Sequence, residues 1–183
     1  MSMTAGQPPA NAVVVRSATL GDLPGLQEVA RCTWRATNSG YIPEAKIERF
    51  LAANDSVGAL SQALVRLGDG MLVAVVNDRV IGYALCGETR ERRGELFAIY
   101  VLPEWQKKSI GRRLWEQAVE HLRSLGVPDM VIWVLAANEL ARRFYERQGA
   151  EVFATRTFPV GDAQIEEVGV TVHTVKLAEV IEQ

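Results

Sequence analysis

Residues 95–114 read ELFAIYVLPEWQKKSIGRRL. The apolar run from Glu95 to Leu102 predicts a strand, Pro103 ends it, and a basic loop leads into an amphipathic helix that begins near Ile110. The loop over residues 106–111 therefore lies where a helix starts. A helix start offers unpaired backbone N–H groups and the positive end of a dipole, so this loop is suited to bind an anion such as a pyrophosphate.

Cations flank this loop on both sides, at Lys107, Lys108, Arg112 and Arg113. The commoner meaning of such a run is a solvated helix face. At the first turn of a helix, however, positive charge opposes the helix dipole. An anionic ligand resolves that conflict, and we therefore favour ligand binding over solvation.

The chain has 183 residues, 48% of them hydrophobic, and a formal net charge of −2. We expect a flexible tail over residues 1–12 and a single domain over residues 13–183. The near-neutral charge gives no reason to expect nucleic acid or a membrane surface as a partner. No basic leader and no run of about 18 apolar residues is present, so we expect a cytoplasmic protein.

Cysteines and histidines are few and scattered along the chain, at Cys32, Cys86, His121 and His173. Metal sites need clusters of such side chains at short, regular spacings. We therefore expect no metal site and two reduced thiols.

Apolar periodicity and turn residues divide the chain into mixed helices and strands. A first helix should start after Asp22, as its N-cap, and keep its spacing to Trp34. Further helices are predicted at 43–51, 56–66, 110–125 and 138–148, and strands at 13–16, 71–76, 80–86, 95–102, 130–135, 151–157 and 168–177. The order predicts an α/β fold of the α+β type, with a mostly antiparallel sheet and one parallel crossover from strand 95–102 through helix 110–125 to strand 130–135.

Two motifs carry a resemblance to the GNAT superfamily of acetyl-CoA-dependent N-acetyltransferases. The loop of residues 106–111 resembles the family's R/Q-x-x-G-x-G/A signature, with Gln106 first and Gly111 last. Ser109 stands where the family usually has glycine, and its side chain crowds a phosphate more than glycine would. The second motif, residues 138–151, is similar to the family's Asn-x-x-Ala-x-x-Phe-Tyr-x-x-x-Gly segment. The resemblance extends over about residues 13–177.

The resemblance implies a splayed sheet in which strands 95–102 and 130–135 part, with the pantetheine arm of acetyl-CoA between them. It assigns the pantetheine contacts to the backbone of Ile99, Tyr100 and Val101 and to Asn138, which can equally be only a helix N-cap. The pyrophosphate would lie on residues Gln106, Lys107, Lys108, Ser109, Ile110, Gly111 and Arg112. Acetyl-CoA is thus the expected cosubstrate, with no metal.

The resemblance also suggests catalytic residues. Glu95 matches a general-base position, although it can also be a solvated strand-end carboxylate, with Glu88 or Glu91 acting through water instead. Tyr145 matches a tyrosine near the CoA sulfur that can protonate the leaving thiolate; the alternative is a core aromatic with a satisfied hydroxyl. Trp34 and Tyr41 lie in the acceptor region of relatives, and packing explains Trp34 almost as well.

These features predict an N-acetyltransferase that moves acetyl to a primary amine of a small molecule, polyamine-like in character, by direct attack in a ternary complex. The sequence is compatible with a homodimer as well as with a monomer. Two alternatives remain: a protein or peptide N-terminal acetyltransferase, which would need an open groove beside residues 36–44 and 157–168, and a non-catalytic CoA-binding regulatory module, which the serine at position 109 favours.

Overall fold

A computed structural model describes residues 12–40, 42–160 and 163–174, so most of the expected N-terminal tail lies outside the described residues. Strands and helices follow one another in the order that the periodicity predicts. The strands are β1 (Val14–Ser17), β2 (Met71–Val76), β3 (Arg79–Glu88), β4 (Gly94–Val101), β5 (Asp129–Leu135), β6 (Glu151–Val160) and β7 (Ala163–His173). The helices are α1 (Leu23–Asn38), α2 (Glu44–Asn54), α3 (Val57–Leu67), α4 (Ile110–Ser124) and α5 (Glu139–Arg147), and short 3₁₀ turns lie at Leu20–Asp22, Gly68–Gly70 and Pro103–Trp105.

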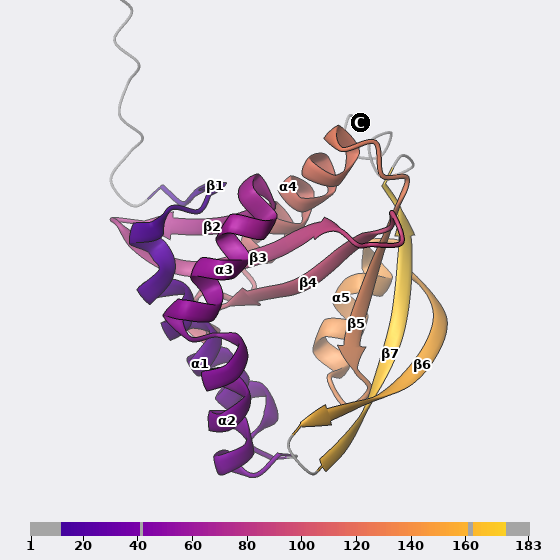
Figure 1. The fold of residues 1–183 in the computed structure, drawn as a ribbon, viewed down its shortest axis with the longest axis horizontal. Coiled ribbons are helices and arrows are strands. Elements are labelled where there is room, and N and C mark those ends of the chain that lie inside the picture. Colours follow the sequence, from indigo (N-terminus) through magenta and orange to yellow (C-terminus); the bar gives the residue numbers. More distant parts are fainter. Residues whose placement is uncertain (1–11, 41, 161–162, 175–183) are drawn as a thin grey trace, which may run out of the picture.

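The strands form one sheet in the order β1-β2-β3-β4-β5-β7-β6. The pairs are antiparallel except for β4 and β5, which are parallel and joined by the α4 crossover. The predicted fold class is therefore confirmed. Figure 1 shows α1, α2 and α3 on one side of the first strands and α4 on the other. Helix α5 packs against α4 through the rings of Trp115, Phe144 and Tyr145.

The helix faces follow from sequence spacing. The exposed positions of α4 are polar, whereas its buried side chains recur every three or four residues along one face: Ile110, Leu114, Trp115, Ala118, Val119 and Leu122. In β2, all six residues are buried, because α3 and α4 both contact this strand. The core thus lies on both faces of the first half of the sheet.

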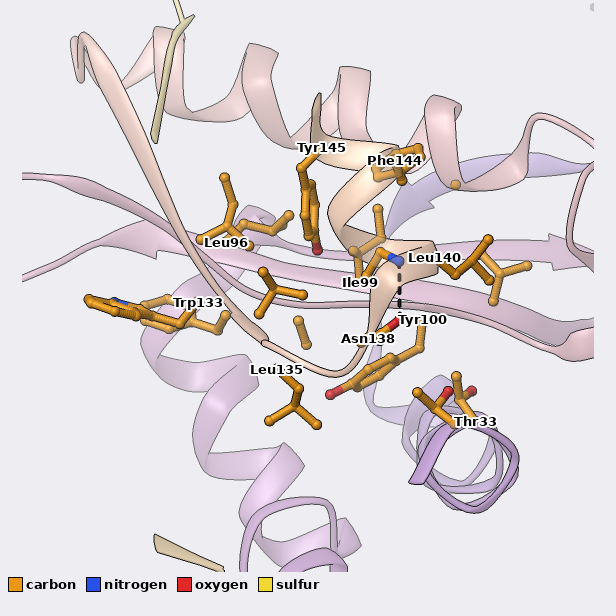
Figure 2. Close-up of a pocket in the computed structure, with 18 of the residues that line it drawn as sticks. Thr33, Leu96, Ile99, Tyr100, Trp133, Leu135, Asn138, Leu140, Phe144 and Tyr145 are labelled. Carbon is orange, nitrogen blue, oxygen red and sulfur yellow. Dashed lines mark hydrogen bonds between the residues drawn. The ribbon is translucent and has the colours of Figure 1, made fainter. Parts of the chain in front are cut away.

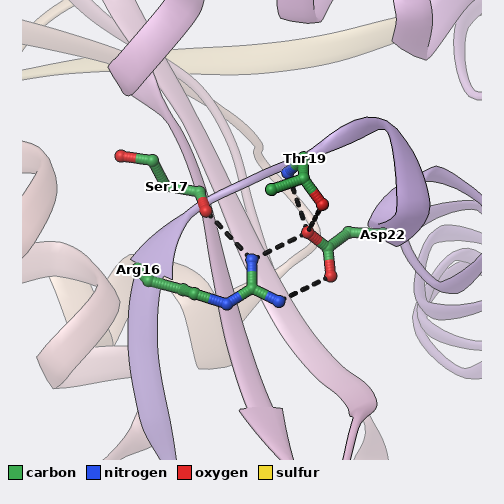
Figure 3. Close-up of polar contacts among 4 residues, drawn as sticks. All are labelled: Arg16, Ser17, Thr19 and Asp22. Carbon is green, nitrogen blue, oxygen red and sulfur yellow. Dashed lines mark hydrogen bonds and ion pairs between the residues drawn. The ribbon is translucent and has the colours of Figure 1, made fainter.

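Asp22 precedes α1, as predicted, but its side chain does not cap that helix. Its carboxylate instead accepts two hydrogen bonds from Arg16, at 2.7 and 2.9 Å, and two from the backbone and hydroxyl of Thr19 (Figure 3). Periodicity could not predict this, because the competing donor comes from β1. The predicted N-cap is therefore wrong in its bonding, and Asp22 joins β1 to the start of α1.

The last hairpin is longer than predicted. β6 runs to Val160, and β7 begins at Ala163, five residues before the expected start at 168. The segment AQIEE does not read as a strand, because it is mostly polar and Ala and Glu are depleted in strands. The expected end of β7 at residue 177 lies beyond the described part of the chain.

Candidate active site

The site lies where the central strands separate. β4 pairs with β5 at three positions within the described residues, from Gly94 with Met130 to Leu96 with Ile132. Beyond these pairs the strands run apart (Figure 1). On its other side, β4 carries a register shift that leaves Phe97 as an extra residue between Ala98 and Leu96. The β5-facing backbone edge of Ile99 to Val101 is therefore left without a strand partner.

A cavity of about 490 Å³ occupies this gap. Figure 2 shows part of its lining, and the labelled side chains come from α1, β4, β5 and the start and body of α5. Further lining residues come from α2, the loop before α4, β6 and β7. Most of the site residues predicted from the sequence line it: Trp34, Glu95, Ile99, Tyr100, Val101, Gln106, Lys107, Ser109, Gly111, Arg112, Asn138 and Tyr145. Residues predicted from three separate motifs therefore lie together around the gap between β4 and β5.

Two predicted residues do not line the cavity. The ammonium of Lys108 lies 4.7 Å from the centre of the Trp105 ring, and the side chain of Ile110 is 2% exposed in the core. Their backbone groups still belong to the loop. Tyr41 lies outside the described residues, so the structure places no side chain there.

The loop before α4 has the backbone shape of an anion site. Lys107 and Ser109 both have left-handed backbone conformations, with φ of 59° and 60°. Ser109 occupies the N-cap position of α4, yet its hydroxyl accepts no bond from the helix. The Gln106 side chain donates to the Val101 carbonyl at 3.0 Å and so fixes the loop to the end of β4. The first N–H groups of α4 are left for a ligand.

The cations that flank the loop do not all face the cavity. Lys107 and Arg112 line the cavity, and Arg112 also donates to Glu116 at 2.7 Å. Arg113 turns away and donates to the Val13 carbonyl at 2.9 Å. Successive helical residues point about 100° apart, so neighbouring arginines cannot both face one anion.

Helix α5 supplies the side chains at the centre of the cavity. Tyr145 is 5% exposed and packs against Trp115 and Phe144, with ring centres at 5.8 and 5.4 Å. Figure 2 shows its hydroxyl pointing into the cavity. Burial raises the pKa of this phenol, so it keeps its proton at neutral pH. Asn138 caps α5, since its Oδ1 accepts from Ala141 N at 3.1 Å, and its amide nitrogen is left for other contacts.

The side chain of Trp34 is fixed by a hydrogen bond and a ring contact. Its indole N–H donates to the Tyr100 hydroxyl at 3.0 Å, and its ring contacts Phe50 at 4.3 Å between centres. It is 7% exposed, yet it lines the cavity. Its two predicted roles, packing and forming a pocket wall, are compatible in this position.

Carboxylates lie at the β4–β7 side of the cavity. Glu95 is half-buried, and its pKa is raised, first by burial and also by the nearby Glu167, against the opposing charges of Arg156 and Arg66. The sequence did not predict Glu167 or Arg156 as site residues. Glu167 falls between the predicted strands 151–157 and 168–177, and the pattern of the first of these strands does not show which residue Arg156 faces. These two residues are direct cross-strand partners in the β6–β7 hairpin, and Arg156 Nε donates to Glu167 at 2.7 Å. Only the strand register brings them into the cavity lining.

The splayed sheet, the anion loop and the central tyrosine define an acyltransferase fold of the coenzyme A-dependent kind. The chain belongs to the acetyltransferase (GNAT) family, whose sequence model matches residues 27–150. It is 30% identical to the uncharacterized N-acetyltransferase YuaI of Bacillus subtilis over 162 residues, which covers 86% of this chain and 91% of that protein. The resemblance drawn from the two motifs is therefore confirmed, and the chain is an acetyl-CoA-dependent acyltransferase.

Two further relatives are from Thermoplasma acidophilum. A spermidine N(1)-acetyltransferase is 27% identical over 144 residues, which covers 76% of this chain and 89% of that protein. The crystal structure of the PaiA N-acetyltransferase in complex with coenzyme A superposes with a TM-score of 0.75 at 25% identity, covering 86% of this chain and 98% of that one.

Among the described residues, no helix is long and apolar enough to cross a membrane. No group of three or more His, Cys, Asp or Glu side chains within the same residues could hold a metal ion.

Proposed function

We propose that the protein transfers acetyl from acetyl-CoA to a primary amine of a small, polyamine-like molecule, by direct attack within a ternary complex. The observation that carries this proposal is the two-sided cavity. One end has the helix-start loop with Lys107 and Arg112, and the other has the carboxylates Glu95 and Glu167. The relation to a spermidine acetyltransferase supports a small cationic acceptor.

The residues present fit coenzyme A. The unpaired N–H groups in the first turn of α4 and the two lining cations suit a pyrophosphate. The open backbone edge of Ile99, Tyr100 and Val101 can pair with the amides of a pantetheine arm as an added strand would. The amide nitrogen of Asn138 can donate to the same arm.

Acetyl-CoA supplies an activated acyl group and a thiol leaving group. Glu95 takes a proton from the acceptor ammonium, and its raised pKa brings it closer to the operating pH of a general base. The amine nitrogen then forms its bond to the carbonyl carbon as the carbon–sulfur bond breaks. Tyr145 gives its proton to the departing sulfur and regains one from the newly acylated nitrogen, which thereby becomes a neutral amide. The Glu95 proton passes to water, so both residues are ready for another turnover.

Thiol release from acetyl-CoA should be measured with purified protein and a panel of alkyl amines, polyamines and short peptides with free N-termini. We expect release with the small amines. Release with peptides alone would point to the N-terminal acetyltransferase alternative. Thermal stabilisation by CoA without thiol release for any acceptor would favour the non-catalytic module.

A further inference from the structure

Glu167 is a buried carboxylate that faces the cavity from β7. It is 8% exposed, and it lines the cavity together with Glu95 of β4. Its negative charge acts across the gap and contributes to the raised pKa of both Glu95 and Tyr100. Two carboxylates therefore approach one another in a partly desolvated space, an arrangement that costs free energy unless a cation accompanies them.

Arg156 supplies part of that positive charge and is engaged on two sides. Its Nε donates to Glu167, and its guanidinium carbon lies 3.9 Å from the centre of the Trp133 ring. Gly169 makes room for this arrangement: a Cβ there would lie 2.9 Å from both Trp133 and Phe153. Trp133 can therefore lie close to β7 and support the guanidinium, which makes Arg156 a positioning residue for Glu167.

The remaining hydrogen-bonding capacity is that of acceptors. Among the described residues, no donor bonds to the carboxylate of Glu95, and Glu167 receives a bond at one oxygen, Oε2. An ionised carboxylate has room for about four hydrogen bonds. Arg66, a second cation whose charge acts on Glu95, is exposed and lies over the Phe97 ring at 5.4 Å. A ligand that completes this side of the cavity must bring N–H donors and positive charge.

We propose that Glu167 is a specificity-determining residue that binds a second, non-reacting ammonium group of the acceptor, so that the preferred substrates are aliphatic diamines and polyamines. This inference rests on the proposed function. Glu95 receives the proton of the reacting amine, and Glu167 holds the far end of the same molecule. A monoamine of equal length leaves Glu167 without its cation.

The test compares two acceptors of matched length, terminal diaminobutane and pentylamine, in which a methyl group replaces the second ammonium. For the native protein we expect kcat/KM to be roughly ten- to a hundredfold higher for the diamine, the range for one charged hydrogen bond. Glu167→Gln should remove this preference through a higher KM for the diamine. Because Glu167 also acts on the general base Glu95, which serves both acceptors, the readout is the ratio of the two kcat/KM values. Glutamine keeps the volume and can still accept from Arg156.

Glu166→Gln is the matched control, since it removes the same charge one residue away, at an exposed position that does not line the cavity. It should leave both acceptors unaffected. Equal kcat/KM values for the two acceptors in the native protein would overturn the inference alone, and this comparison requires no variant. A diamine preference that survives in Glu167→Gln, with acetyl-CoA affinity intact, would also overturn it. If neither amine releases thiol, the proposed function fails and the inference with it.

Discussion

At the scale of single residues, a substitution of Gly111 tests whether the loop of residues 106–111 binds the pyrophosphate of CoA. A Cβ at this position would meet its nearest atoms, on Phe144 and Val101, at 3.9 and 4.0 Å, which is ordinary contact. Gly111→Asp should therefore fold, and a carboxylate in the first helical turn even suits the helix dipole. It should nevertheless weaken CoA binding at least tenfold, about 1.4 kcal/mol, because it repels the phosphates.

Calorimetric titration with CoA measures this change, and Gly111→Ala is the control for added volume. The alanine variant should bind CoA within a few-fold of the native protein. An aspartate variant with native affinity would show that the pyrophosphate does not bind at this loop.

Tyr145 tests the leaving-group step. Burial raises the pKa of its hydroxyl, which points into the cavity and receives no hydrogen bond from the described residues. Tyr145→Phe keeps the packing against Trp115 and removes the proton. We expect kcat to fall by roughly a hundredfold while the affinity for CoA changes little. Steady-state kinetics at saturating acetyl-CoA measures the effect, and an unchanged kcat would remove Tyr145 from the mechanism.

At the scale of elements, two aspartates hold helix ends to the sheet and respond to pH in opposite directions. Asp22 joins β1 to α1, and its pKa is lowered to about 2, first by the hydrogen bonds from Arg16. It stabilises the fold above the ordinary value of 3.8, and this contribution is lost as the pH falls toward 2. Asp55, at the end of α2, accepts a hydrogen bond from the Tyr83 hydroxyl of β3 at 3.1 Å.

Burial raises the pKa of Asp55 from 3.8 to about 6. Its contribution is therefore fully present below pH 3.8 and is lost as the pH rises through about 6. Asp55→Asn keeps an acceptor for Tyr83 and avoids the buried charge. We expect it to stabilise the protein by on the order of 2 kcal/mol at pH 7, with the gain disappearing toward pH 4.

Thermal or urea unfolding across this pH range measures the difference between the Asp55→Asn and native proteins. Asp69→Asn, at an exposed position before β2, is the control and should show no such pH-dependent gain. An Asp55→Asn variant less stable than the native protein at pH 7 would mean that the ionised carboxylate is stabilising where it lies.

At the scale of the whole molecule, the sheet consists of two halves joined at the three paired positions of β4 and β5. Strands β1–β4 form one half and β5–β7 the other. A ligand in the gap contacts both halves, so binding should rigidify backbone that the fold itself leaves unpaired. We expect CoA to slow hydrogen exchange in peptides that cover residues 97–101 and 106–111.

The β2–β3 hairpin serves as the internal control, because its backbone is already paired on the far side of β4. Its exchange should not change at a CoA concentration that protects the gap. Protection confined to segments other than β4 and the loop would place the coenzyme elsewhere.

The local sequence determined the class of this protein. Apolar spacing gave the faces of α1 and α4, glycine and proline marked the helix ends, and the motifs around Gly111 and Tyr145 predicted residues that do line one cavity. Such features depend on neighbours within about one helical turn, and backbone capping and burial periodicity are encoded at that range.

The tertiary structure alone decided which side chains meet across the gap. The pairing of Arg156 with Glu167 depends on the β6–β7 register, and Asp22 is bonded by Arg16 of a preceding strand rather than by its own helix. The energies of ion pairs and buried carboxylates depend on desolvation and on contacts between residues that are far apart in the sequence. A local sequence pattern does not encode either of them. For that reason the loop that should bind the coenzyme could be predicted from the chain, whereas the side of the cavity proposed to select the acceptor could not.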